Sequence, residues 1–181
     1  MSHLSATARA CNGLLRPLRA PLCALTLATL LAACAMPTHP DSAAPAPDPY
    51  NPAAVQLLDD TSWELTSWQN ADGTSRTVPH GDNGEPIKLV LSTQSGIRRA
   101  SGFAGCNRYM GAYNVKNGLL SFGPLAGTRM ACPNTLGGQL ERAYLDALAH
   151  IAKTGVQMRD PQQLQIVTEA GATLTFTRRG P

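Results

Sequence analysis

The dipeptide Asn117-Gly118 constrains the fold of this chain more than any other feature of its sequence. It lies between two strand-like runs, residues 111–116 (GAYNVK) and 119–122 (LLSF). Asn-Gly between such runs is the strongest short-range signal for a tight β-hairpin, because both residues tolerate the positive φ angles of the turn. The sequence therefore predicts an antiparallel pair of strands here.

Other short segments have strand-like composition and are separated by turn residues. We predict strands over the following ranges: 61–69, 87–92, 98–104, 128–131, 156–159, 164–168 and 173–177. In the first of these, alternation places Trp63, Leu65 and with them Ser67 on one face. Residues 70–73 (NADG) predict a turn, and residues 78–86, rich in Gly, Pro, Asn and Asp, predict a loop.

One segment has helical periodicity instead. Between residues 135 and 153, apolar side chains recur every three or four residues on one face: Leu136, Leu140, Ala143, Tyr144, Ala147, Leu148 and Ile151. Asn134 or Thr135 can cap the start, and Gly155 is expected to end the helix. The expected fold class is mainly β (α+β): a small antiparallel curved sheet or barrel-like domain with one packed helix.

The N-terminal segment has the composition of an export signal. Residues 1–19 carry three arginines and no acid, and residues 20–33 are apolar, which is too short for a membrane-spanning helix but typical of a signal peptide. The sequence Leu31-Ala32-Ala33-Cys34 resembles a bacterial lipobox, so we predict a signal peptide over 1–33 and lipidation of Cys34. The alternatives are an ordinary secreted protein in which Cys34 is incidental, or an uncleaved short anchor. By resemblance to sorted lipoproteins, Ala35 indicates the outer membrane.

The same arginines explain the basic character of the chain. Its net charge of +3 comes from 15 basic and 12 acidic residues, and removing the three arginines of residues 1–33 leaves 12 of each. Aromatic residues make up 5% of the chain, too few for a stacking surface. We therefore expect no nucleic-acid partner. We expect instead contact with the membrane through lipidated Cys34 and an unknown protein or small-molecule partner.

Residues 34–58 are predicted to be a tether and residues 59–181 one folded domain. The tether contains prolines that disfavour helix and sheet: Pro37, Pro40, Pro45, Pro47, Pro49 and Pro52. Such a segment prefers an extended conformation and lifts a domain off a membrane. The roughly 120 residues that follow suffice for a modest core.

Two motifs distinguish the domain. The first is Gly105-Cys106-Asn107-Arg108-Tyr109-Met110-Gly111, and the second is Thr128-Arg129-Met130-Ala131-Cys132. Together with the opening sequence TSWEL, they resemble the META domain of the HslJ heat-inducible lipoproteins over about residues 59–178. The resemblance implies a small β-rich domain with one helix in a membrane-anchored envelope protein. It also implies links to heat response and novobiocin resistance, but no defined molecular activity.

The residues of these motifs leave two readings open. In an oxidising periplasm Cys106 and Cys132 can form a disulfide, or they can remain two buried free thiols. Asn107, Arg108, Thr128 and Arg129 can form a polar surface site, or Asn107 and Thr128 can bind loop backbone groups while the arginines lie in solvent. The absence of a C-x-x-C motif argues against thiol–disulfide exchange.

Signatures of catalysis are missing from the sequence. It contains no G-x-S-x-G and no H-E-x-x-H, and no histidine has a second ligand at metal-binding spacing, so we expect no metal and no cofactor. No acid pair resembles a catalytic dyad. We therefore expect a non-enzymatic, lipid-anchored outer-membrane protein that faces the periplasm and supports envelope integrity, stress tolerance or tolerance of novobiocin-type antibiotics. The alternatives are a ligand-binding or enzyme-inhibitor β-barrel module and, third, an enzyme.

Overall fold

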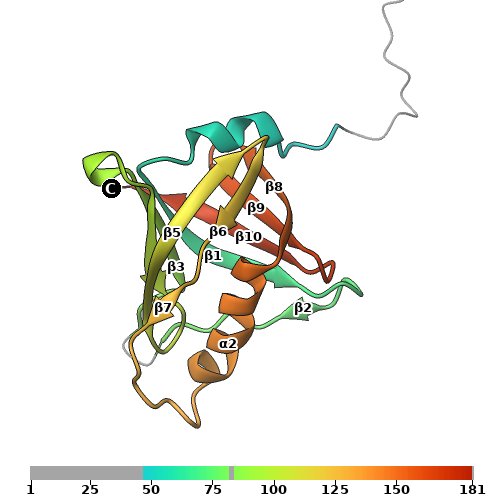
Figure 1. Ribbon diagram of the computed structural model, residues 1–181. Coiled ribbons are helices and arrows are strands. Elements are labelled where there is room, and N and C mark those ends of the chain that lie inside the picture. Colours follow the sequence, from blue (N-terminus) through green and yellow to red (C-terminus); the bar gives the residue numbers. More distant parts are fainter. Residues whose placement is uncertain (1–46, 82–83, 181) are drawn as a thin grey trace, which may run out of the picture. The chain divides into compact units, whose positions relative to one another are not determined.

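The computed structural model describes residues 47–81 and 84–180, and these contain ten β-strands and one α-helix (Figure 1). The strands are β1 (Thr61–Gln69), β2 (Ser75–Arg76), β3 (Lys88–Ser92), β4 (Arg99–Phe103), β5 (Arg108–Lys116), β6 (Leu119–Phe122), β7 (Ala126–Gly127), β8 (Ile151–Gln157), β9 (Gln163–Thr168) and β10 (Thr173–Arg179). The helix is α2 (Leu136–Ala149), and two short 3-10 helices are η2 (Pro52–Leu57) and η3 (Gln94–Gly96). The predicted signal peptide and the lipidation site Cys34 lie outside the described residues.

All strands belong to one antiparallel sheet that curls into a nearly closed barrel. Its order is β6-β5-β4-β3-β1-β10-β9-β8, with β2 paired to β1 and β7 paired to β5. The two end strands meet through a side chain, because the Leu120 amide donates a hydrogen bond of 3.2 Å to Thr154 Oγ1. The expected fold class, a mainly β barrel-like domain with one packed helix, is confirmed.

The Asn117-Gly118 hairpin joins β5 and β6 as the sequence predicts. Asn117 has a φ of 54° and Gly118 a φ of 76°, and Lys116 pairs with Leu119 across the turn. Residues 70–73 likewise form the predicted turn after β1, where the Gly73 amide donates to the Asn70 carbonyl at 2.9 Å.

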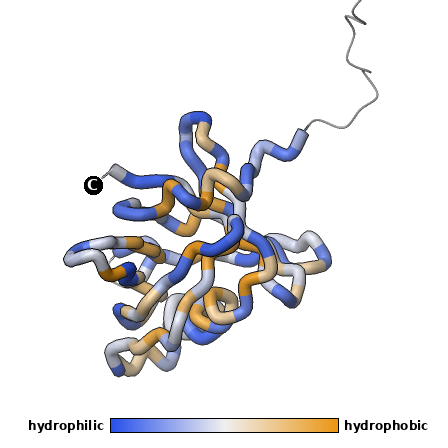
Figure 2. Tube along the Cα trace, turned by 45° about the horizontal axis from the view of Figure 1, so that its top comes forward, coloured by the Kyte–Doolittle hydropathy of each residue, from blue (hydrophilic) through white to orange (hydrophobic). Residues whose placement is uncertain are grey.

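The interior of the barrel is filled by side chains that alternate along the strands. Figure 2 shows hydrophobic and hydrophilic residues mixed along the Cα trace of the domain. The largest of them are Trp63, Phe176 and Tyr144, each at most 1% exposed. Helix α2 contributes Tyr144, whose hydroxyl lies 3.0 Å from that of Tyr109. Burial raises the pKa of both tyrosines well above the ordinary range. The helix is thus joined to the barrel by aromatic packing and a buried polar contact.

The helix ends earlier than its periodicity predicts. The expected range was 135–153, but α2 stops at Ala149, and Ile151 already begins β8. Gly155 therefore lies inside a strand and does not end the helix. Tyr50 occupies the space that a side chain at this position would need. Of the predicted strand 156–159, residues 156 and 157 form the end of β8, and residues 158 and 159 lie beyond it. Pairing of β8 with β9 supplies inter-strand hydrogen bonds that outweigh the local helical pattern.

Two smaller predictions are also wrong. Leu136, placed on the buried face of the helix, is 61% exposed at its first position. Residues 128–131 form no strand, and β7 lies just before them. The reason is that the side chain of Asn107 hydrogen-bonds both the amide and the carbonyl of Met130. Neither group is then available to pair with another strand.

Strand β1 contains an irregularity that changes which residues face inward. Trp63 and Leu65 are buried as predicted, but Ser67 is exposed and Trp68 is buried in its place. The cause is a register shift between Leu65 and Ser67 in the pairing with β10. Such a bulge adds a residue to one strand and moves the following side chains to the opposite face.

The last residues assigned to the tether pack on the barrel. Asn51 caps η2, because its side chain accepts a hydrogen bond from the Ala53 amide at 2.8 Å. Pro52 lies in the first turn, where the backbone N–H that proline lacks would have no partner within the helix. Val55 and Leu58 are fully buried. Residues 51–58 thus belong to the folded domain. Among the described residues, no helix has the length and apolar character to cross a membrane.

Candidate functional site

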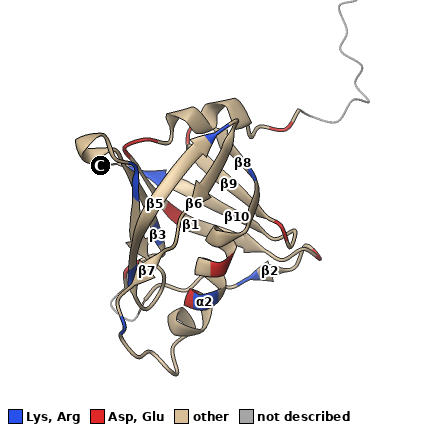
Figure 3. Cartoon of the chain, in the orientation of Figure 1, with Lys and Arg blue, Asp and Glu red and all other residues tan. Residues whose placement is uncertain are grey.

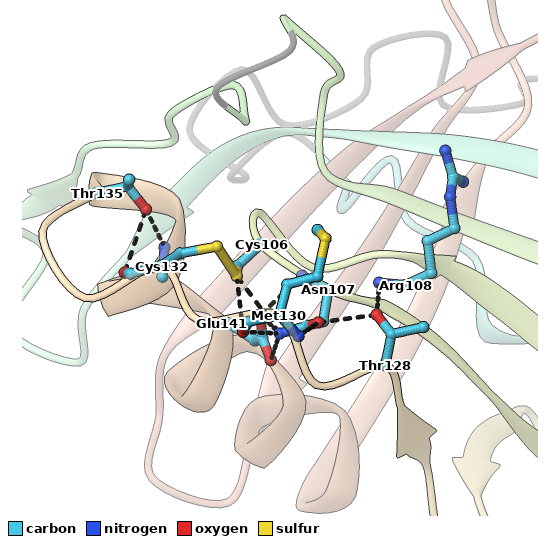
Figure 4. The surroundings of a disulfide bond; sticks show 9 residues. Cys106, Asn107, Arg108, Thr128, Met130, Cys132, Thr135 and Glu141 are labelled. Carbon is cyan, nitrogen blue, oxygen red and sulfur yellow. Dashed lines mark hydrogen bonds between the residues drawn. A yellow bond between two sulfur atoms is a disulfide. The ribbon is translucent and has the colours of Figure 1, made fainter.

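The two family-like motifs meet beside the start of helix α2 (Figure 4). Cys106 and Cys132 are joined by a disulfide, with their Cα atoms 6.1 Å apart and a sequence separation of 26. The bond ties the segment before β5 to the segment before α2. Of the two readings left open by the sequence, the structure contains the bonded pair.

Asn107 is the centre of the polar contacts around this disulfide. Its side chain is 6% exposed. Its Oδ1 accepts from the Met130 amide at 2.7 Å and from the Thr128 hydroxyl at 2.8 Å, while its Nδ2 donates to the Met130 carbonyl at 3.2 Å. The side chain of Asn107 thereby supplies the hydrogen bonds that a neighbouring strand would otherwise give to residues 128–130.

Helix α2 completes the network through Glu141. Both carboxylate oxygens of Glu141 accept from Asn107 Nδ2 at 3.1 Å, and Oε2 also accepts from the Asn107 backbone amide at 2.9 Å. On the opposite side, Thr128 Oγ1 accepts from the Arg108 amide at 3.2 Å. The contacts connect β5, the 128–130 segment and the helix.

Glycines allow these segments to approach each other. Gly105 has a φ of 106°, and a side chain there would lie 2.8 Å from the carbonyl oxygen of Gly137. A side chain on Gly137 would clash in turn with the carbonyl of Gly105. Thr135 caps the helix by accepting from the Gly138 amide at 3.0 Å. The glycine of the first motif therefore permits close backbone packing.

The two arginines of the motifs point away from this network. Arg108 forms an ion pair with Glu85 at 2.7 Å, with 66% of its side chain exposed, and Arg129 is exposed at the surface. The four proposed surface residues are therefore divided: Asn107 and Thr128 bind neighbouring loop groups, and Arg108 and Arg129 face solvent. This arrangement matches the second reading of the motif rather than a polar surface site.

Sequence reasoning did not identify the role of Glu141, because it considered the acids only as possible catalytic pairs. A signal was present: Gly137, Glu141, Tyr144 and Leu148 follow each other at spacings of four, three and four, so Glu141 lies on the helix stripe that faces the barrel. An acid on a buried stripe needs a hydrogen-bonding partner.

A shallow pocket of about 390 Å³ opens over this region. It is lined by the disulfide, Met130, Pro133, Glu141 and Arg142 among others. The carboxylate of Glu141 already accepts hydrogen bonds from Asn107, so it is engaged in structure. Among residues 47–81 and 84–180, no three metal-binding side chains gather as a metal site requires.

A separate ion cluster ties the start of the domain to the barrel. Arg98 binds Asp59 through two nitrogens, at 2.8 and 3.1 Å, and the Tyr113 hydroxyl donates to Asp59 at 2.7 Å. The hydrogen bonds from Arg98 hold the pKa of Asp59 below its usual value. The side chains of Arg98 and Asp59 are 34% and 32% exposed, so the cluster is a partly solvated surface contact.

The charges of the domain are mixed rather than gathered by sign. Figure 3 shows basic and acidic residues interspersed along the strands and the helix that face the viewer. Ion pairs link Arg98 to Asp59, Arg108 to Glu85 and Arg179 to Glu64. Each of these three arginines thus has a carboxylate beside it.

The fold and the motif network together define a small β-barrel domain stapled by one disulfide and capped by one helix. The META domain family model matches residues 56–181, and the chain belongs to this family. An NMR structure of a protein from Burkholderia xenovorans is 65% identical, with a TM-score of 0.70, and the match covers 81% of this chain and 100% of that chain. A second NMR structure is 24% identical with a TM-score of 0.46, and the match covers 68% of this chain and 92% of that one. No functionally curated protein matches the chain.

Proposed function

We propose that this protein is a non-enzymatic lipoprotein of the bacterial cell envelope, anchored in the outer membrane through Cys34, with its META domain facing the periplasm. The basic segment, the apolar residues 20–33 and the Leu31-Ala32-Ala33-Cys34 sequence support the anchor. Two or more acyl chains hold a protein stably on a membrane, because each buried methylene contributes about 0.8 kcal/mol.

The disulfide is the observation that carries this proposal. Structural disulfides persist in oxidising compartments and are rare where thiols are kept reduced. Cys106 and Cys132 are the only cysteines that follow Cys34 in the sequence, and they are bonded to each other. The predicted export signal and the bonded cysteine pair in the domain are together consistent with a location outside the cytoplasm.

A structural role for the family motif supports a non-enzymatic function. Asn107 hydrogen-bonds Thr128, Glu141 and the backbone of Met130, which leaves these side chains engaged in holding α2 to the barrel. In the proposed role, the domain contributes to envelope integrity and to tolerance of heat or of novobiocin-type antibiotics. It does so as a stable interaction module.

The anchor is tested by substitution of Cys34. Cys34→Ala is expected to release the protein from the membrane fraction into the soluble fraction, as measured by ultracentrifugation of cell lysates and immunoblotting. Cys23→Ala is the matched control, since Cys23 lies inside the apolar run, and it should leave the distribution unchanged. Sedimentation of the Cys34→Ala chain with membranes, with its signal segment removed, would refute the lipid anchor.

A second function, binding of a small ligand, is favoured by a different observation. The barrel interior is filled by side chains such as Trp63 and Phe176, so a ligand has to bind at the surface of the domain. A hollow between α2 and the ends of β1 and β9 is lined by Trp68, whose indole N–H is buried without an acceptor.

A further inference from the structure

The indole nitrogen of Trp68 is buried without a hydrogen-bond partner. Among the described residues, it is the only buried side-chain nitrogen or oxygen in this state. The other tryptophan shows the contrast, because Trp63 Nε1 donates to Thr61 Oγ1 at 2.7 Å. Buried polar groups in folded proteins nearly always have a partner, so this exception needs an explanation, and a bound molecule that supplies an acceptor is one.

The bulge in β1 is what places Trp68 there. Trp63 and Leu65 face the interior, and simple alternation would put Trp68 on the outer face. The register shift between Leu65 and Ser67 reverses the alternation and turns Trp68 inward. Bulges commonly re-aim a side chain next to a functional site, so the local geometry is consistent with a specific role for this indole.

A pocket of about 400 Å³ adjoins Trp68. It lies where the second half of α2 approaches the β1–β2 and β9–β10 turns, and its apolar wall consists of small side chains: Ala143, Ala147, Ala170 and Ala172. Pockets for small molecules have volumes of about 300–1,000 Å³ and combine an apolar lining with a few polar groups. The pocket therefore has room for an apolar body of about ten atoms.

A positive charge lies over the indole. The guanidinium carbon of Arg76, on β2, lies 4.8 Å from the centre of the Trp68 ring. Among the described residues, no carboxylate forms an ion pair with Arg76. The acids of the pocket lie at its rim: Asp146 is 73% exposed and is paired with His150 at 3.3 Å, and Glu169 is exposed. Solvent screens these rim charges more than it screens the arginine that covers the indole.

We propose that this pocket binds a small organic acid with an apolar body. The carboxylate accepts hydrogen bonds from Trp68 Nε1 and from the guanidinium of Arg76, and the body packs against the alanines of α2 and of the β9–β10 turn. Arg76 moves with the ligand, since its side chain is flexible and lies over the ring. The proposal deepens the second function above, ligand binding, and is independent of the lipid anchor, so either can fail without the other.

The two indole N–H groups provide the readout. Heteronuclear NMR spectra of the purified, isotope-labelled full chain should show two indole signals, assigned with Trp63→Phe. Titration with phenylbutyrate, an aryl carboxylate of about 12 non-hydrogen atoms, is expected to saturate in the millimolar range. The Trp68 signal should move downfield as its hydrogen bond forms, and the Trp63 signal should stay in place.

Matched variants and a matched probe test the assignment of roles. Arg76→Gln should weaken phenylbutyrate binding about tenfold, because it removes a charge-assisted hydrogen bond. Arg99→Gln, at an exposed position on β4 outside the pocket, should bind as the wild type does. Ala143→Leu should fill the pocket and abolish the shift. The neutral amide, phenylbutyramide, should bind at least tenfold more weakly than the acid.

Three results would overturn the proposal. One is a Trp68 signal that does not move at saturating probe, or that moves together with the Trp63 signal. Another is equal binding by the Arg76→Gln variant and the wild type. The third is equal binding of the acid and the amide. Shifts confined to signals remote from Trp68 would also count against this site, while leaving ligand binding elsewhere on the domain as the surviving function.

Discussion

The two halves of helix α2 face polar groups of opposite kinds. Near its start, the helix meets Asn107, whose side-chain oxygen and nitrogen both have partners, including Glu141 from the helix itself. Near its end, the helix borders the pocket of Trp68, whose N–H has none, and of Arg76, which has no ion-pair partner among the described residues. In the first region the polar side chains hydrogen-bond one another. In the second region the N–H of Trp68 has no acceptor and Arg76 has no ion-pair partner among the described residues.

The difference shows why a distinctive motif need not be a binding site. The residues that make this sequence resemble its family, Cys106, Asn107 and Thr128, hold the helix and the 128–130 segment in place. Saturated hydrogen bonds and a disulfide add stability but leave little for a ligand to contact. The ligand chemistry lies instead with a tryptophan and an arginine that no motif marks.

The disulfide is expected to be the largest single contribution of the first region. The double substitution Cys106→Ala, Cys132→Ala should lower the free energy of unfolding by about 3.5 kcal/mol, from the chain entropy of a 26-residue loop. Urea unfolding followed by circular dichroism measures this, with Cys34→Ala as the control that should leave domain stability unchanged. A loss under about 1 kcal/mol would mean that the hydrogen bonds alone hold the region.

Asn107 should rank next. Asn107→Ala leaves the amide and the carbonyl of Met130 and one side of Glu141 without their partner, and buried unpaired groups cost about 1–3 kcal/mol each. Partial access of water to the opened site reduces the sum, so we expect a loss of about 3 kcal/mol.

The control for Asn107→Ala is Asn114→Ala, on the exposed face of the same strand β5. This substitution should change the free energy of unfolding by less than about 0.5 kcal/mol. If the two variants are equally stable, the hydrogen bonds of Asn107 are not what secures the helix, and the contrast between the two regions disappears.

Local sequence signals predicted much of the sheet. Strand β1 and the β5–β6 hairpin follow from alternation and from Asn117-Gly118, because these signals depend only on neighbouring residues. The end of α2 could not be read in this way. Residues 151–153 continue the helical pattern, but they pair with β9, which is distant in sequence, and that pairing decides their conformation.

The same limit applies to the two polar regions. The motifs pointed to Asn107 and Thr128, but Glu141, which accepts hydrogen bonds from Asn107, is 34 residues beyond Asn107 and is brought there by packing. The burial of Trp68 could not be predicted, because it depends on the bulge in β1. Nothing in the sequence TSWELTSWQ indicates that a bulge occurs there. Alternation alone gives such a side chain the wrong face.

The two tryptophans allow the contrast to be measured within one strand. Trp63→Phe and Trp68→Phe remove the same ring atoms from positions at most 3% exposed, but the first also breaks the bond to Thr61 Oγ1, and the second removes a donor that has no partner. Trp63→Phe should therefore reduce the free energy of unfolding by about 1 kcal/mol more than Trp68→Phe does. Urea unfolding of the two variants under identical conditions gives the difference. An equal or larger loss for Trp68→Phe would mean that this indole already has an acceptor in the free protein, and the second region would then be as closed as the first.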